Sequence, residues 1–262
     1  MHRLIARIAG LVFAVPFLYF LCKKGIPWPE AGLYVLMGFL FLGQAVIGWV
    51  MVSSGLVDRP SVSHYLLTAH LFLALTLIGL ALWTAFGHHY GSPAAKRKVK
   101  WSTASKLAAG GLAVLLIQIA YGGFTAGLKA GHVSDTWPLM LGQLVPRGLL
   151  SQLQPPLRNL VEAPATVMFI HRWFAFLGLA VAVVVFGEIR RRKLSADISV
   201  GLNILATLAL FQVGLGIALV LFHVQTAIAL MHQAVAIGLF ASTVYLLHRL
   251  RAADTMVAAG AA

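Results

Sequence analysis

Seven long apolar stretches divide the 262-residue chain. They cover residues 4–22, 31–53, 62–86, 107–128, 166–189, 200–222 and 224–247. Each is close to the roughly 20 apolar residues that a helix needs to cross the hydrocarbon layer of a bilayer. The stretches therefore predict an all-α, polytopic membrane protein with seven transmembrane helices and a lipid bilayer as its main surroundings.

The charged residues predict how these helices are oriented. Only 10% of the residues are charged, yet 20 lysines and arginines stand against 7 acids. Most of the cations follow the first, third, fifth and seventh stretches, for example Lys23, Lys24 and the run 190–193. Because such loops face the cytoplasm, we expect the chain to start outside and to end in the cytoplasm. The positive charge then needs no nucleic-acid partner.

The second half of the chain repeats the first. His2-Arg3 opens the first stretch and His171-Arg172 the fifth; Gln44 with Gly48 matches Gln212 with Gly216, and His70 matches His232. The fourth stretch holds Gln118 and Gly122 but has no counterpart. The repeat predicts two pseudo-repeated four-helix bundles, residues 1–100 and 101–262, the first short of one helix and truncated at its start. We interpret the glutamines as contacts between helices, because the glycines permit close approach.

Four histidines are expected at one depth in these bundles: His2 and His70 in the first half, His171 and His232 in the second. Two facing imidazoles in an apolar bundle suit the two axial positions of a haem iron. Zinc would require three or four ligands, and the acids lie outside the deep parts of the stretches. The alternative for each histidine is a hydrogen bond to a neighbouring helix.

The remaining polar residues give weaker predictions. Arg3 and Arg172 could pair with haem propionates, or their side chains could extend to the membrane surface. His248 is expected to be solvated at a cytoplasmic helix end, as are His88 and His89. His132 lies in the long outer segment 129–165, which is rich in tryptophan, proline and leucine and is predicted to lie on the membrane as a lid.

Several motifs resemble those of haem A synthase, in the form shared by alphaproteobacteria and mitochondria, and the likeness covers essentially the whole chain. They are GLKAGH at 127–132, TWPLM at 136–140, RNL at 158–160, FIHR at 169–172 and LMHQ at 230–233, with VSHY at 62–65 and AHL at 69–71 in the first half. The resemblance implies an eight-span membrane enzyme that oxidises a methyl group of haem O to the formyl group of haem A for cytochrome c oxidase.

The resemblance also implies roles for the candidate residues. His171 and His232 would bind a haem b cofactor with Arg172 beside them, while His2, His70 and Arg3 would flank the substrate haem O. Haem O synthase and cytochrome c oxidase assembly factors would be partners, with a homo-oligomer left open. The membrane would be the bacterial inner membrane rather than the mitochondrial one.

One motif departs from the family pattern. Family members carry Glu-x-x-His-Arg where this chain has only Met1-His2-Arg3. A chain that starts at Met1 is therefore expected to lack the family glutamate, and the catalytic residue is left unassigned. Three alternatives follow: a non-enzymatic electron-transfer protein with bis-histidine haem b, a truncated and inactive synthase, and a transporter built from repeats.

Overall fold

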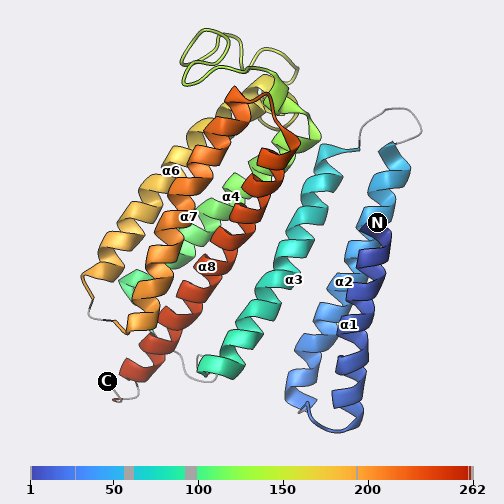
Figure 1. Ribbon diagram of the computed structural model, residues 1–262, viewed down its shortest axis with the longest axis vertical. Helices are drawn as coiled ribbons and strands as arrows, with labels where there is room; N and C mark the ends of the chain where they lie inside the picture. The colour runs from blue at the N-terminus through green and yellow to red at the C-terminus, as the bar shows by residue number, and fades with distance from the viewer. Residues whose placement is uncertain are drawn as a thin grey trace. The chain divides into compact units, whose positions relative to one another are not determined.

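The computed structural model describes residues 2–26, 28–55, 62–91, 99–192, 194–258 and 260, and the side chains of 2, 3, 28, 29, 54 and 55 lie outside that description. Seven long helices occupy these ranges (Figure 1): α1 (His2–Cys22), α2 (Trp28–Gly55), α3 (His64–Tyr90), α4 (Thr103–Gly127), α6 (Pro164–Arg190), α7 (Ala196–Leu221) and α8 (Thr226–Ala258). Three short turns of helix lie between α4 and α6: η1 (Ala130–His132), η2 (Pro156–Arg158) and α5 (Asn159–Glu162).

All seven long helices are long and apolar enough to cross a membrane. Helices are the form that such segments must take, because a backbone in lipid has to satisfy its own hydrogen bonds. Local signals fix some of the ends: the Ser102 hydroxyl accepts a bond from the Ser105 amide at the start of α4, and Pro164 begins α6. The predicted all-α membrane fold is confirmed, but α8 continues to Ala258, past its predicted end at 247.

The chain divides into two compact units, Met1–Ala81 and Leu82–Ala262, so the division falls inside α3. In the first unit, α1 and α2 lie side by side (Figure 1). The Phe17 ring stacks on Phe13 and Tyr34, with centroids 5.8 and 6.2 Å away. The functional assignment of the two halves remains a prediction.

In the second unit, α4, α6, α7 and α8 form a four-helix bundle (Figure 1). Each helix packs against two neighbours, in the cyclic order α4, α6, α7, α8 and back to α4. The end of α3 joins this unit, where the Trp83 ring meets His248 edge-on at 4.9 Å. Side chains from all four helices therefore line the interior of the bundle.

Buried apolar side chains fill this bundle at its two ends. The basal cluster lies where α4 and α7 begin and α6 and α8 end, and comprises Ala104, Ala108, Val185, Ile189, Ile198, Leu202, Leu205, Leu239, Leu246, Leu247 and Leu250. The loop cluster lies at the opposite end and comprises Ala130, Met140, Met168 and Val220. The helix segments between the two clusters carry the polar residues described next.

Candidate functional site

His171 and His232 face each other inside the second unit, with ring centroids 6.5 Å apart and planes inclined at 77°. They lie seven residues after Pro164 in α6 and six after Thr226 in α8. At 1.5 Å per residue, these positions are about 10 and 9 Å from the helix starts. Both helices begin at the end of the bundle that carries the loop cluster. The structure thus brings together the pair that the sequence predicts in the second half.

Gln118 and Gly122 of α4 hold the His171 ring. The Gln118 amide nitrogen lies 3.2 Å from His171 Nδ1 and also donates to the His171 backbone carbonyl at 3.0 Å. A Cβ placed on Gly122 would lie 3.3 Å from His171 Cε1. The ring is therefore confined between the glutamine amide and the bare backbone one helical turn further along.

Gln212 and Gly216 of α7 do the same for His232. The Gln212 amide nitrogen lies 3.3 Å from His232 Nε2, and a Cβ on Gly216 would lie 3.4 Å from His232 Cε1. The prediction that these glutamines make contacts between helices is confirmed, and the contact in each case is with a candidate ligand. Sequence reasoning assigned the glutamines to helix packing and did not connect them to the histidines.

The first unit contains a third copy of this arrangement. The Gln44 amide nitrogen of α2 lies 3.2 Å from His70 Nε2, and a Cβ on Gly48 would lie 3.1 Å from His70 Cε1. His70 stands six residues after the start of α3, at about the same depth along its helix as His232 along α8. The side chains of His2 and Arg3, the other predicted residues of this half, lie outside the described part of the structure.

The separation of the His171 and His232 rings is compatible with two ligands of one haem iron. Two metal–nitrogen bonds of about 2 Å, with about 1 Å more from each nitrogen to its ring centre, place two axial imidazole centres about 6 Å apart. The observed centroid separation is 6.5 Å. No three histidine, cysteine or acidic side chains cluster to hold a metal ion anywhere in the described ranges. The pair therefore suits an ion that takes two protein ligands and its remaining ligands from a macrocycle.

Arg172 is the charged residue nearest in sequence to this pair, and it is buried, with only 7% of its surface exposed. Its guanidinium donates to the backbone carbonyls of Thr136 at 3.1 Å and Ser134 at 2.9 Å. Arg172 Nε is buried and has no partner among the described residues, and no described carboxylate forms an ion pair with it. A buried cation with neutral partners retains its attraction for an anionic group.

The outer segment is ordered by buried polar contacts. Asn159, fully buried, donates to the carbonyls of Leu150, Leu153 and Pro156 and accepts from the Leu153 amide. The Trp137 ring stacks on Phe176 of α6 at 5.8 Å. Several large apolar side chains of the segment remain exposed, namely Leu139, Leu141, Leu144, Val145, Leu150 and Leu157. The segment covers the end of the bundle through Met140, while its placement on a membrane remains a prediction.

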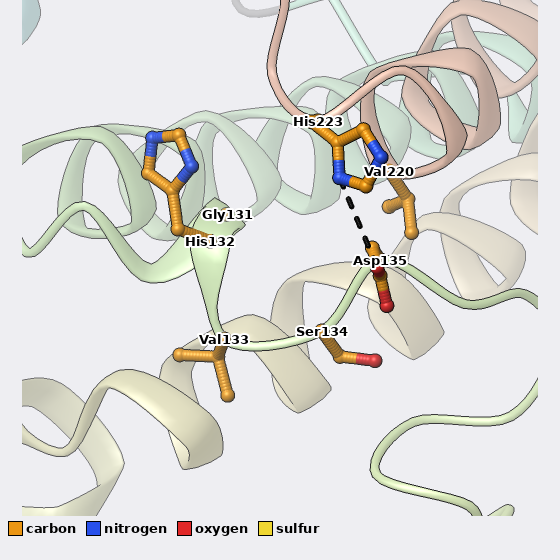
Figure 2. Close-up of a pocket in the computed structure, with 7 residues that line it drawn as sticks. All are labelled: Gly131, His132, Val133, Ser134, Asp135, Val220 and His223. Atoms are coloured by element: carbon orange, nitrogen blue, oxygen red, sulfur yellow. Dashed lines mark ion pairs between the residues drawn. The ribbon is translucent and has the colours of Figure 1, made fainter.

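A small pocket of about 210 Å³ lies beside this segment (Figure 2). It is lined by Gly131, His132, Val133, Ser134, Asp135, Val220 and His223. The His223 ring faces Asp135, with Nδ1 3.8 Å from Oδ2, and both side chains are exposed. The pocket includes neither His171 nor His232, so it is separate from the histidine pair.

His248 is not solvated, contrary to the sequence-based prediction. Its exposed fraction is 0%, and its ring packs against Trp83 and Phe86, with centroids 4.9 and 5.9 Å away. The prediction was wrong because α8 runs on to Ala258, which places His248 within the helix, and because aromatic side chains from α3 cover it. His88 and His89 are exposed, as predicted.

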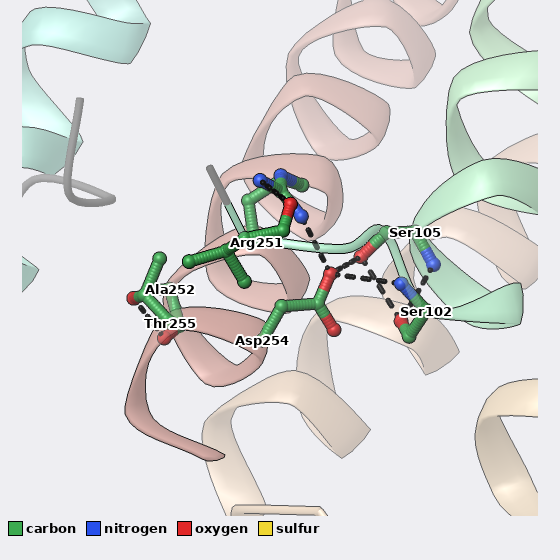
Figure 3. Close-up of polar contacts among 7 residues, drawn as sticks. Ser102, Ser105, Arg251, Ala252, Asp254 and Thr255 are labelled. Atoms are coloured by element: carbon green, nitrogen blue, oxygen red, sulfur yellow. Dashed lines mark hydrogen bonds and ion pairs between the residues drawn. The ribbon is translucent and has the colours of Figure 1, made fainter. Parts of the chain in front are cut away.

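The extension of α8 is fixed to the start of α4 by Asp254 (Figure 3). Asp254 Oδ2 accepts from the Ser102 amide at 3.2 Å, the Ser105 hydroxyl at 2.7 Å and Arg251 Nη1 at 2.9 Å. The Arg251 guanidinium also lies over the Trp101 ring, 4.4 Å from its centroid. This cluster closes the bundle at the end opposite to the outer segment.

Comparison with known proteins agrees with this architecture. The family described as cytochrome oxidase assembly protein matches residues 1–244. Curated haem A synthases from Flavobacterium johnsoniae and Wolbachia pipientis are 37% and 39% identical, over 95% and 97% of this chain and 72% and 70% of their own length. One from Mesorhizobium japonicum is 42% identical over 90% of this chain and 64% of its own. The chain therefore belongs to the cytochrome oxidase assembly protein family.

Proposed function

We propose that this protein is a haem A synthase, an oxidoreductase that converts a methyl group of haem O to the formyl group of haem A. The observation that carries the proposal is the pair of half-buried imidazoles, His171 and His232, at a separation that suits two ligands of one haem iron. The relatives with this name align with the chain over both halves. The three glutamine–glycine–histidine units support a role for His70 like that of the other two.

In this proposal, His171 and His232 hold a haem b, which accepts electrons when bound. Arg172 pairs with a propionate through its buried Nε while its other nitrogens hold Ser134 and Thr136. His70, together with His2 and Arg3, binds haem O in the first half. Apolar clusters lie at both ends of the second bundle, and a polar contact in apolar surroundings is stronger than the same contact in water.

The multi-pass membrane protein is proposed to lie in a bacterial inner membrane, with its start outside and its end in the cytoplasm. The basal end of the second bundle carries Arg190, Arg249 and Arg251, which supports a cytoplasmic location for that end. The proposed partners are the enzyme that supplies haem O and the factors that deliver haem A to cytochrome c oxidase. A homo-oligomer is compatible with this role.

The test is to express the full chain in a host that makes haem O but no haem A, and to identify the haems by chromatography and mass. We expect haem A in the membranes and haem b in the purified protein. His171→Ala and His232→Ala should lose both, whereas His223→Ala, which changes an exposed histidine outside the pair, should retain both.

Three outcomes would contradict the proposal. Stoichiometric haem b with unconverted haem O would identify an electron-transfer protein or an inactive synthase. A purified wild type without haem would favour a transporter. Retention of haem b by both alanine variants would show that the iron ligands lie elsewhere.

A further inference from the structure

We propose that Gln118 and Gln212 are positioning residues that fix the rotation of the His171 and His232 rings, and that Gln44 does the same for His70. This inference rests on the proposed function, because it assumes that the first two rings bind haem iron. It goes beyond that function by assigning a role to side chains that touch only the ligands. The role follows from the contacts of each glutamine and of the glycine four residues after it.

The arrangement recurs on three pairs of adjacent helices. The amide nitrogen of Gln44, Gln118 or Gln212 lies 3.2, 3.2 or 3.3 Å from a ring nitrogen. The following glycine would bring a Cβ to 3.1, 3.3 or 3.4 Å from Cε1 of the same ring. Helix packing alone does not require that the glutamine and the glycine contact the same imidazole in all three helix pairs. Gln233, next to His232, is exposed, so a glutamine in an apolar helix is not held in this way by default.

Each glutamine also leaves a hydrogen-bonding group unused. Gln44 Oε1, Gln118 Oε1 and Gln212 Oε1 are buried without a partner among the described residues. A buried carbonyl that makes no bond costs stability, so a side chain selected for helix association alone would be expected to satisfy both ends of its amide. A neutral imidazole has one lone pair, so a ring that binds iron carries its N–H on the other nitrogen and needs an acceptor there. An amide turned by 180° presents its oxygen to that N–H, and this gives the oxygen the partner that it otherwise lacks.

The two contacts restrict different motions of the ring. The amide contact fixes the direction of one ring nitrogen, and the glycine lets the Cε1 edge lie against the helix backbone, where a side chain would displace it. The His171 and His232 planes lie at 77° to each other, and in the proposed role the two contacts maintain this angle. Groups that hydrogen-bond to a ligand ring tune both its orientation and its basicity toward the metal.

The angle between two axial imidazole planes has a spectroscopic consequence. It sets the splitting of the iron d orbitals, and hence the g values of the low-spin ferric haem in electron paramagnetic resonance. A change of ring rotation moves those g values even when both ligands stay bound. A loss of packing alone lowers the haem content and leaves the signal of the remaining haem in place.

The experiment uses the full-length, haem-loaded protein and its Gln118→Leu and Gln212→Leu variants, with Gln233→Leu as the matched control. We expect both site variants to shift the largest g value and to lose haem to an apoprotein acceptor about 10- to 100-fold faster, the range typical of outer-shell changes. Gln233→Leu should match the wild type in both measurements.

Two further variants keep the test decisive if the leucine variants do not fold. Gly122→Ala and Gly216→Ala retain the glutamines and displace the rings by a few tenths of an ångström, so they should also shift the signal. Unchanged g values in every folded variant of these four positions would overturn the inference. A wild type without a bis-histidine signal would instead overturn the proposed function.

Discussion

The replacement of Asp254 by alanine is expected to destabilise the second unit by about 3 kcal/mol. The side chain of Asp254 is 10% exposed and that of its partner Arg251 is 13% exposed, so most of the ion pair is covered by protein. Removal of one member of a buried pair typically costs about 3–5 kcal/mol. The lower end of this energy range applies to Asp254→Ala because Arg251 retains the Trp101 ring and the Val99 carbonyl as partners. Asp254→Asn, which keeps an oxygen acceptor, should cost about half as much.

The measurement is thermal unfolding of the purified protein in detergent, followed by tryptophan fluorescence. For a unit of this size, about 3 kcal/mol corresponds to a fall in Tm of about 6–12 °C. The matched control is Glu188→Ala, because Glu188 pairs with Arg192 at 2.7 Å but the two side chains are 24% and 36% exposed. Such a partly exposed pair contributes only about 0–1 kcal/mol. Equal Tm values for Asp254→Ala and Glu188→Ala would refute the reasoning.

Three further predictions concern other parts of the second unit. Arg172→Met leaves the Ser134 and Thr136 carbonyls without their donor, so hydrogen exchange at 134–141 should accelerate about 30-fold, and unchanged exchange would contradict the contact. His248→Leu replaces a buried ring whose nitrogens have no described partner, so Tm should rise by a few degrees, about 1 kcal/mol; a fall would show that the ring makes a stabilising bond. Gly201→Ala would bring a Cβ to 2.6 Å from Tyr245 Cε1 and should cost about 1–3 kcal/mol, whereas Gly214→Ala, with nothing within 4 Å, should be nearly neutral by the same melting assay.

The sequence was sufficient to predict the spans and the histidine pair. The spans follow from the thickness of a bilayer, which requires long apolar runs wherever a chain crosses it. His171 and His232 stood out because a polar ring within such a run is costly and because each has a counterpart in the first half. The apolar runs and the repeated histidines can both be read from the sequence alone, without knowing which helices are neighbours.

The partners of these residues could not be predicted in the same way. Gln118 meets His171 because α4 packs on α6 in one particular register, and the sequence does not specify that register. The burial of His248 depends on Trp83 of another helix. Hydropathy measures affinity for lipid, so it placed the end of α8 at 247, where the apolar run ends. The more polar residues after 247 continue the helix, and Asp254 among them packs on α4 through its bond with Ser105.

The position of the histidine pair along the bundle has an electrical consequence. His171 lies about 10 Å from the start of α6, but 19 residues, or about 28 Å, separate it from Arg190 at the other end, and the basal cluster fills much of that distance. If α6 spans a 30 Å hydrocarbon layer from its start, a charge that enters from the near end crosses about a third of that layer, and a potential of 100 mV does about 0.8 kcal/mol of work on it. In the proposed function, electrons and protons that leave together by that same end carry no net charge across the membrane, so the turnover is expected to be independent of the membrane potential.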